Sequence, residues 1–413
     1  MSTGSDWLER VPERWERKKL KHVATLRSGD SITSDDIAEA GDYPVFGGNG
    51  IRGYSTRYTH QGDYVLIGRQ GALCGNIKYA SGFFWASEHA VVVGVRHGTD
   101  VTWLGELLRS MDLNRYSQSA AQPGLAVDVL ANLEIPVPPT LEQRAIGKYL
   151  QGEVGRLDAL VRAKERVLGL LAEKRRALIT RAVTRGLDPG VRLRGSGIPW
   201  LGKIPAHWDV RQLKYVTLSL QTGPFGSQLH AAEYAVGGTP LVNPSHLSGG
   251  WIQAEDGVSV DDVTADRLAI HRLRLGDLVF ARRGELGRCG IVEPDNVGWL
   301  CGTGSLRARL RPQAAEPHYL ALVFRQTRIA DVLTFQSVGS TMDNLNSDIL
   351  GSCHVPVPPV AEQHAIVGYL ATKALEIDTL HSATERTIGL LKERRAALIA
   401  AAVTGQIDVS AVA

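Results

Sequence analysis

Cysteine is scarce in this sequence, and so are long apolar runs. The 413 residues contain 4 cysteines (Cys74, Cys289, Cys301 and Cys353), and no two of them form a C-x-x-C pair. This spacing argues against a disulfide framework or a zinc knuckle and is typical of a reducing cytoplasm. No apolar run approaches the ~20 residues that span a bilayer, and the first residues lack the apolar core of a secretory signal. We therefore expect a cytoplasmic protein without a membrane partner.

Recognisable catalytic motifs are also missing. Residues 48–53 match G-x-G-x-x-G, but residues 54–59 are poor helix formers, whereas a dinucleotide site needs a helix directly after the glycines. We interpret the run as a glycine-rich turn, with a cofactor loop as the alternative. Residues 197–203 have the outline of a P-loop, yet Ile204 stands where Ser or Thr would bind magnesium. With no metal-ligand cluster and no nucleophile elbow, we expect no catalytic, cofactor or metal site in this chain.

The main positive feature is an internal repeat. Residues 135–184 recur as residues 355–404 at a constant offset of 220, from the Pro-rich segment at 136–139 to the Ala-Val-Thr at the end. A second match precedes each block: Trp7, Pro12 and Trp15 recur at an offset of 193 as Trp200, Pro205 and Trp208. The ends of each half are therefore shared, while the middles differ by insertions. A repeat of this length predicts a pseudo-twofold molecule that recognises its partner in two halves.

Charge is distributed unevenly over a net charge of +3. The middle blocks are acidic, with net charges of −4 for residues 23–134 and −3 for residues 216–354. Residues 141–186 are basic at +6, and residues 187–215 add +3. If the middle blocks bind nucleic acid, they must therefore use local basic clusters.

The repeated stretches have the pattern of long helices with a coiled-coil seam. Apolar residues recur in steps of 4 and 3 over four heptads in each copy, without an internal proline. The first seam is Leu150, Val154, Leu157, Val161, Lys164, Leu168, Leu171, Arg175, Leu178 and Ala182. The second is Leu370, Ala374, Ile377, His381, Thr384, Ile388, Leu391, Arg395, Leu398 and Ala402. If the seams pair, chain order requires the helices to be antiparallel, and Thr140 is the expected N-cap of the first. Packing helices unrelated to recognition are the alternative.

The middle blocks alternate short β-branched or aromatic runs with glycine-rich turns, which predicts strands. Short helices are expected near 103–111 and 318–327. The predicted fold class is α+β, with two β-rich domains held apart by a pair of long antiparallel coiled-coil helices.

In each half one predicted strand ends in Arg-x-Gly, at Arg69 and at Arg282. A glycine turn lets the backbone approach a groove, and the arginine fork matches guanine or phosphate; an arginine that only pairs with its own fold is the alternative. The candidate DNA contacts are Arg69, Gln70, Asn49, Lys78, Arg282, Arg283, Arg288, Asn243, His246 and Asn344. A short tryptophan-containing segment, here called the lead-in, precedes the middle block in each half. Its tryptophans are expected in the core rather than as platforms on which bases stack.

Taken together, these motifs resemble the specificity subunit of a type I restriction–modification enzyme. The matching pattern is Pro-x-Pro-Pro, Glu-Gln-x-Ala-Ile, Tyr-Leu and Arg-x-Ala-Leu-Ile at 136–184 and 356–404, with the two Trp-Leu lead-ins and the run at 276–284. The resemblance covers nearly the whole chain, and the doubled arrangement is its most specific part.

The resemblance implies a domain plan and a set of partners. It places target recognition domain 1 at 1–139, a spacer helix at 140–186, a linker with target recognition domain 2 at 187–359, and a second spacer helix with the tail at 360–413. Each recognition domain would read half of a bipartite double-stranded DNA target. The helices would space the domains and dock two methyltransferase subunits, and motor–nuclease subunits would join. S-adenosylmethionine, ATP and magnesium would then belong to the partners. A scaffolding or ligand-binding protein without nucleic-acid specificity is the competing hypothesis.

Overall fold

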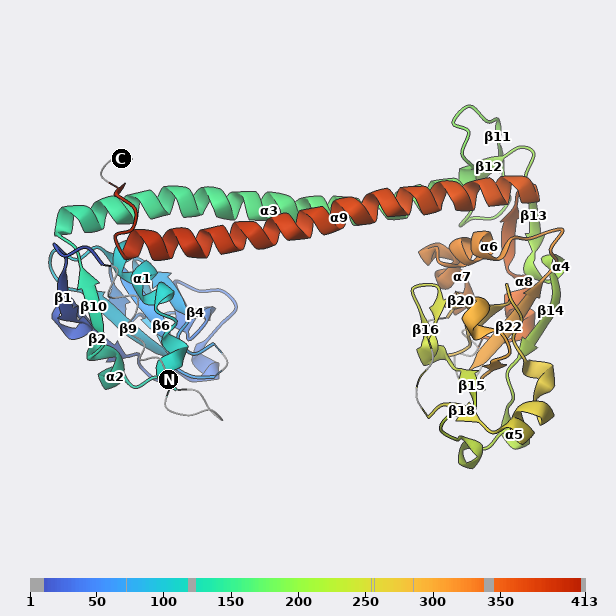
Figure 1. The fold of residues 1–413 in the computed structure, drawn as a ribbon, viewed down its shortest axis with the longest axis horizontal. Coiled ribbons are helices and arrows are strands. Elements are labelled where there is room, and N and C mark those ends of the chain that lie inside the picture. The colour runs from blue at the N-terminus through green and yellow to red at the C-terminus, as the bar shows by residue number, and fades with distance from the viewer. Residues whose placement is uncertain are drawn as a thin grey trace. The chain divides into compact units, whose positions relative to one another are not determined.

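The structure, a computed structural model, describes residues 11–71, 73–117, 124–253, 255, 257–284, 286–337 and 345–409. It divides into two compact units. The first unit comprises residues 1–167 and 383–413, and the second comprises residues 168–382. Two long helices, α3 (Thr140–Arg185) and α9 (Val360–Val403), each begin in one unit and end in the other. The expected pair of long helices and the α+β class are confirmed (Figure 1).

Both units contain the same sheet. Four antiparallel strands follow the order β2-β9-β6-β7 in the first unit and β14-β22-β19-β20 in the second. The strands of the first sheet are β2 (Ala24–Ser28), β9 (Ala90–Val95), β6 (Tyr64–Gly68) and β7 (Ile77–Ala80). Those of the second are β14 (Thr217–Thr222), β22 (Ser305–Leu310), β19 (Leu278–Ala281) and β20 (Cys289–Ile291). The repeat therefore includes the middle blocks, where the sequences differ most.

The smaller elements follow the same plan. A parallel strand pair joins β3 (Tyr43–Gly47) to β8 (Phe83–Ala86), and its counterpart joins β15 (Thr239–Val242) to β21 (Leu300–Cys301). The lead-in strand pairs with the strand before each long helix, as β1 (Glu16–Lys19) with β10 (Glu134–Val137) and β13 (Asp209–Gln212) with β23 (His354–Val357). The other strands are β4 (Gly50–Ser55), β5 (His60–Gln61), β11 (Leu193–Gly195), β12 (Lys203–Pro205), β16 (Leu247–Ser248), β17 (Trp251–Ile252) and β18 (Ser259–Val260).

Short helices complete each unit. The predicted helices near 103–111 and 318–327 are confirmed as α1 (Val101–Ser110) and α6 (Pro317–Phe324). The remaining helices are α2 (Val127–Ala131), α4 (Leu213–Val216), α5 (Asp262–Arg267), α7 (Thr327–Ser337) and α8 (Ser347–Ser352).

The central strands are buried on both faces, and their side chains alternate between two cores. In β6, Val65 and Ile67 join the core that contains α1 and the long helices, while Leu66 joins a second core with Phe84. In β19, Leu278 and Phe280 likewise join the core that contains the long helices, whereas Val279 and Ala281 join a separate core on the other face. Alternation with a period of two is what a strand dictates. These strands therefore read as continuous apolar runs because both faces are covered.

The repeated Glu-Gln motif fastens the start of each long helix to its unit. Gln143 is buried and donates from Nε2 to the carbonyl of Pro138, while its Oε1 accepts from the Asp100 N–H at the start of α1. Gln363 makes the equivalent bonds to Pro358 and to the Glu316 N–H before α6. A buried amide with both ends satisfied fixes the geometry of two helix starts. The helix itself begins at Thr140, so the expectation that this residue is the N-cap is off by one position.

Each unit contains a stretch of both long helices, and these stretches are antiparallel (Figure 1). In the first unit Arg395 Nε lies 2.9 Å from Asp158 Oδ1, and in the second Arg175 Nη1 lies 2.8 Å from Asp378 Oδ1. Moving 17 residues forward along α3, from Asp158 to Arg175, is matched by moving 17 residues back along α9, from Arg395 to Asp378. Both units therefore use the same antiparallel register, and both pairs obey the offset of 220.

The lead-in of each repeat packs against the end of the other repeat's helix. Gly405, after α9, would place a Cβ 2.5 Å from Pro12 and 3.0 Å from Trp15, and Gly186, after α3, would place one 3.2 Å from Trp208. Both glycines have positive φ, of 73° and 71°, so they end their helices in the left-handed conformation. Trp15 and Trp208 are buried, as expected of core residues, whereas Trp7 lies outside the described residues.

Candidate nucleic-acid interface

The two Arg-x-Gly sequences occupy the same corner of the repeated fold. In the first unit the N–H of Arg69, after β6, donates to His89 O, and its carbonyl accepts from the N–H of Leu125, both at 2.9 Å. In the second unit the N–H of Arg282, after β19, donates to Gly304 O, and its carbonyl accepts from Leu345, again at 2.9 Å. The backbone of both arginines is thus clamped in the same way between two neighbouring segments.

In the first unit the corner leads into an open turn. Gly71 has a φ of 78°, and a Cβ placed there would meet nothing within 4 Å. Arg69 Nη1 donates to Ser28 Oγ at 2.9 Å, and no described residue forms an ion pair with its guanidinium. Gln70 is exposed and its Oε1 lies 3.2 Å from His89 Nδ1. Because neither of these side chains forms an ion pair with a described residue, they retain hydrogen-bonding capacity for a ligand.

The turn at 48–49, between β3 and β4, brings Asn49 to the same place. Gly48 passes so close that a Cβ there would lie 2.9 Å from His89 O and 3.5 Å from Gly68 Cα. Asn49 and Gln70 then line one hollow of about 510 Å³. The other residues around this hollow are Gly47, Gly48, Gly50, Ile51, Arg52, Leu73 and His89. Because strand follows turn here, the glycine-rich run is a hairpin rather than a cofactor loop, which confirms the turn interpretation.

Lys78 lies in β7, at the edge of a second hollow of about 490 Å³. Its Cε is 3.9 Å from the Cβ position of Gly50, and Asn76 Nδ2 donates to Asn49 Oδ1 at 3.2 Å, so the two hollows adjoin. The four first-unit candidates are therefore neighbours in space. Arg52 and His89 were not among the residues predicted from the sequence, although Arg52 lies inside the glycine-rich run at 48–53.

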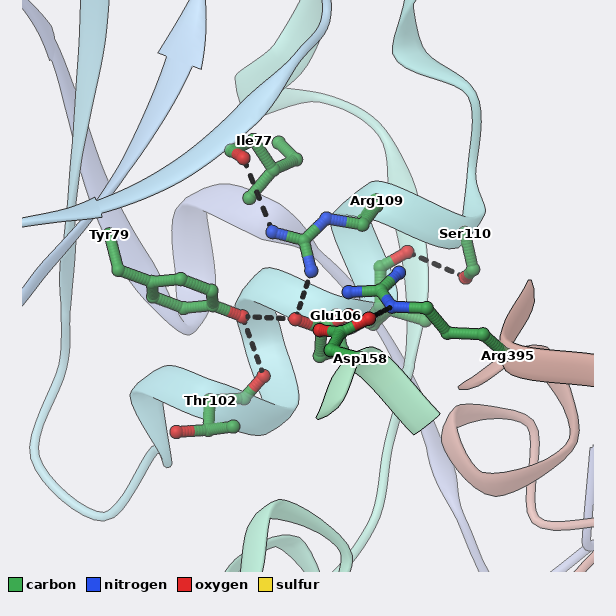
Figure 2. A network of polar contacts seen from close by, with 9 residues as sticks. Ile77, Tyr79, Thr102, Glu106, Arg109, Ser110, Asp158 and Arg395 are labelled. Atoms are coloured by element: carbon green, nitrogen blue, oxygen red, sulfur yellow. Dashed lines mark hydrogen bonds and ion pairs between the residues drawn. The ribbon is translucent and has the colours of Figure 1, made fainter. Parts of the chain in front are cut away.

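A buried polar network ties β7 to α1 (Figure 2). The hydroxyl of Tyr79 donates to Glu106 Oε1 at 3.0 Å, Arg109 pairs with the same carboxylate, and Arg109 Nη2 donates to Ile77 O at 3.2 Å. Burial raises the pKa of Tyr79, and the nearby charge of Glu106 adds to this rise, so the phenol stays protonated as a donor. Since Lys78 lies between Ile77 and Tyr79, the network fixes the strand that carries it.

In the second unit the two arginines of the corner differ. Arg282 is half-buried and its Nε donates to Leu345 O at 2.9 Å. Burial lowers the pKa of Arg282, and the neighbouring charge of Arg283 lowers it further. Arg283 is exposed and forms no ion pair within the described part of the chain. Arg282 therefore serves the fold, while Arg283 points its charge at solvent.

The three remaining described candidates of the second unit meet at one turn, Pro244–His246. Arg288 Nη2 donates to Pro244 O at 2.7 Å, and Arg288 Nε is buried without a partner among the described residues. The Asn243 N–H lies 3.3 Å from His246 Nδ1, and His246 Nε2 lies 3.1 Å from Glu255 Oε2. His246 is buried, so its ring is engaged within the unit. Asn344 lies outside the described residues.

Among the described residues no group of three or more His, Cys, Asp or Glu side chains could hold a metal ion. The described helices also include none that is both long and apolar enough to cross a membrane.

Comparison with known proteins identifies a protein family. A family model described as the type I restriction modification DNA specificity domain matches residues 12–164 and again residues 205–386, once in each repeat. The EcoprrI type I restriction enzyme specificity subunit of Escherichia coli is 46% identical over 138 residues, which is 32% of this chain and 34% of that protein. The EcoKI specificity subunit of Escherichia coli strain K12 is 23% identical over 281 residues, 67% of this chain and 58% of that protein. The alignments thus span less than two thirds of these relatives.

Solved structures share the fold. A chain from a structure of the assembly and conformational transition of the type I R-M system matches with a TM-score of 0.70 at 16% identity, over 96% of this chain and 99% of the other. The HsdS subunit from Thermoanaerobacter tengcongensis matches with a TM-score of 0.58 at 17% identity, over 96% and 98%. At these identities the likeness concerns the fold alone.

Proposed function

Because the chain belongs to the family of the type I restriction modification DNA specificity domain, we propose that it is the DNA sequence-recognition subunit of a type I restriction–modification complex. Each unit reads one half of a bipartite double-stranded target. The observation that carries this proposal is the doubled corner: one backbone clamp holds Arg69 in one unit and Arg282 in the other. The side chains around this clamp differ between the two units, as expected if each unit recognises a different DNA sequence.

The proposed contact residues lie around these corners. In the first unit they are Arg69, Gln70, Asn49 and Lys78, to which we add Arg52 and His89 because they share a hollow with Gln70. In the second unit Arg283 is the leading candidate, since it is exposed and unpaired within the described chain. Arg282, Arg288, Asn243, His246 and Asn344 stay predictions, and the first four of these already hold local structure.

The long helices act as a spacer and as docking surfaces for two methyltransferase subunits. Besides the seam, they expose a second set of large apolar side chains that nothing in their own unit covers. In the first unit these include Leu160, Val167 and Leu390, and in the second they include Leu170, Leu375 and Leu380. Leu160 and Leu170 recur as Leu380 and Leu390 at the offset of 220. Exposed apolar residues at helical spacing suit packing against partner helices.

The chain itself performs no catalysis in this proposal. Methyl transfer and DNA translocation with cleavage belong to methyltransferase and motor–nuclease subunits, which bring S-adenosylmethionine, ATP and magnesium. The complex works on DNA in the cytoplasm. The alternative, a scaffold without nucleic-acid specificity, is not favoured by the family.

Reconstitution tests the proposal. The purified chain should show no methyltransferase activity with S-adenosylmethionine, and its methyltransferase subunits alone should show no site preference. Mixed together, they should methylate adenine at one bipartite sequence. A mixture that assembles but methylates or retains DNA without sequence preference would favour the scaffolding alternative.

A further inference from the structure

A strongly basic groove lies in the second unit. It has a volume of about 710 Å³ and is formed by the last turns of α3, the start of β12 and the start of α7. Its cationic residues are Arg176, Arg181, Arg185, Lys203 and Arg328. No carboxylate lines the groove, and no ion pair links any of the five cations to a residue in the described ranges.

The fold does not account for this charge. Cations favour the C-terminal end of a helix, which is a reason for Arg181 and Arg185, but Lys203 and Arg328 come from other elements. The internal repeat gives a sharper comparison. Arg176 and Arg181 correspond at the offset of 220 to Ala396 and Ala401 in α9. The same helical frame therefore forms with alanine at both positions, and the charge serves something other than folding.

The groove has the chemistry of a phosphate site. Arginine forks bind phosphate oxygens in a bidentate manner, and hydroxyls at Thr180, Thr184 and Thr327 line the same groove. From Arg176 to Arg185 α3 rises about 14 Å. Roughly four phosphates of one DNA strand occupy that length at 3.4 Å each, so the three arginines that α3 contributes to the groove are spread over a comparable stretch of backbone.

The groove and the proposed recognition loop both contact α7. Arg328, in the first turn of α7, lines the groove. Gly287, in the loop after Arg283, approaches the same helix so closely that a Cβ there would lie 2.9 Å from Leu333 Cδ1. Arg328 and Leu333 are separated by about 8 Å along the helix. The shared helix favours a duplex that reaches the recognition loop over an unrelated acidic protein.

We propose that this groove binds the phosphate backbone of DNA without reading its sequence. The inference rests on the proposed function for the nature of the polyanion. It explains how a chain whose recognition blocks are acidic can contribute its own phosphate contacts: four of the five cations come from the basic helix end and the linker, and only Arg328 comes from a block.

The test uses the full chain and fluorescent duplexes of about 30 base pairs with random sequence, titrated over a salt series. The variant Arg176→Ala/Arg181→Ala copies the residues of α9. A matched control, Arg162→Ala/Lys174→Ala, removes the same charge from exposed positions of α3 outside the groove. Loss of two phosphate contacts should lower the slope of log K against log salt by about 2 and affinity by roughly tenfold or more at low salt, relative to the control.

Equal slopes for the variant and the control would overturn the proposal. So would unchanged DNA binding combined with loss of a partner subunit, because the groove would then be an acidic-protein surface. Should the helix variant fail to fold, Lys203→Gln/Arg328→Gln tests the same groove from β12 and α7. Random duplexes make the result independent of sequence reading: if the complex lacked any target preference while the slope still fell, only the proposed function would fail.

Discussion

At the scale of single residues, two consecutive arginines of the second unit have different roles. Arg282 supplies a hydrogen bond to Leu345 O, which belongs to a segment that returns 63 residues later. Arg283 is exposed just before Gly284, whose φ of 76° turns the chain. An arginine whose Nε is already engaged by its own fold has less left for a base edge, so the recognition role falls to Arg283.

Separate alanine substitutions should distinguish these roles. Arg282→Ala leaves Leu345 O without its donor and should lower the free energy of unfolding by about 1–3 kcal/mol, measured by urea denaturation. Arg283→Ala should leave unfolding unchanged within about 0.5 kcal/mol. In the assembled complex it should weaken target binding by about 1–3 kcal/mol and relax one base position. Target binding equal to wild type in Arg283→Ala would remove this residue from the recognition surface.

The sequence predicted where the two Arg-x-Gly corners lie, but it did not predict which of their residues pack within the fold and which are exposed. Arg-x-Gly after a strand is a local signal, and it placed Arg69 and Arg282 correctly at the ends of β6 and β19. The burial of His246 and its contact with Glu255 depend on a turn folding back over nine residues, which no periodicity encodes. Arg52 and His89 were missed because the hollow they share with Gln70 is assembled from three separate loops.

At the scale of elements, the long helices show what a heptad pattern determines. The seam predicted the buried faces: Leu157, Leu171, Ile377 and Ile388 are all at most 9% exposed. The pattern does not fix which residue of one helix faces which residue of the other, since sliding by a heptad keeps the seam apolar. The register is marked instead by polar pairs at its edge, Asp158 with Arg395 and Arg175 with Asp378.

Charge exchange tests this register. Asp158→Arg should destabilise the first unit by placing like charges together, and Arg395→Asp should do the same. The double exchange should recover part of the loss. The pair is partly exposed, so a coupling free energy of about 0.5–1 kcal/mol is expected in a double-mutant cycle measured by urea denaturation. As a control, Arg144→Asp combined with Arg395→Asp should show no coupling, because Arg144 is exposed and lies about 21 Å along α3 from Asp158. Zero coupling in both cycles would show that these charges do not hold the helices in register.

At the scale of the whole molecule, one plan occurs twice with different contents. The sheet order, the clamp at the corner, the glutamine at each helix start and the glycine after each helix all recur. The repeated ends could be recognised in the sequence because the two copies share residues. The repeated sheets could not be recognised in this way, because insertions alter the spacing between strands and only the sheet topology is kept. We infer that the shared frame determines the distance between the two recognition units, and that the different side chains at the two corners determine which DNA sequence each unit prefers.

Lengthening the frame should change spacing alone. Insertion of one heptad after Val161 and another after Leu391 keeps both seams in phase, because these positions correspond in the antiparallel register that Asp158 and Arg395 mark in the first unit. Seven residues add about 10 Å of helix, or about three base pairs at 3.4 Å each. Methylation mapping should find the same two half-targets with a gap about three base pairs longer. A two-residue insertion, which turns the following part of each seam about 200° away from its partner, should abolish assembly. Altered half-target letters in the heptad variant would argue against a passive spacer.

The most direct measurement is to exchange one middle block and read the methylated sites. Residues 23–134 are replaced by the corresponding block of another family member, the chain is expressed with its methyltransferase subunits, and modified bases are mapped across the genome. We predict that one half of the target changes while the other half stays, and that exchanging residues 216–354 changes only the opposite half. Exchange of either block that altered both halves, or neither, would contradict the account of two independent readers on one frame.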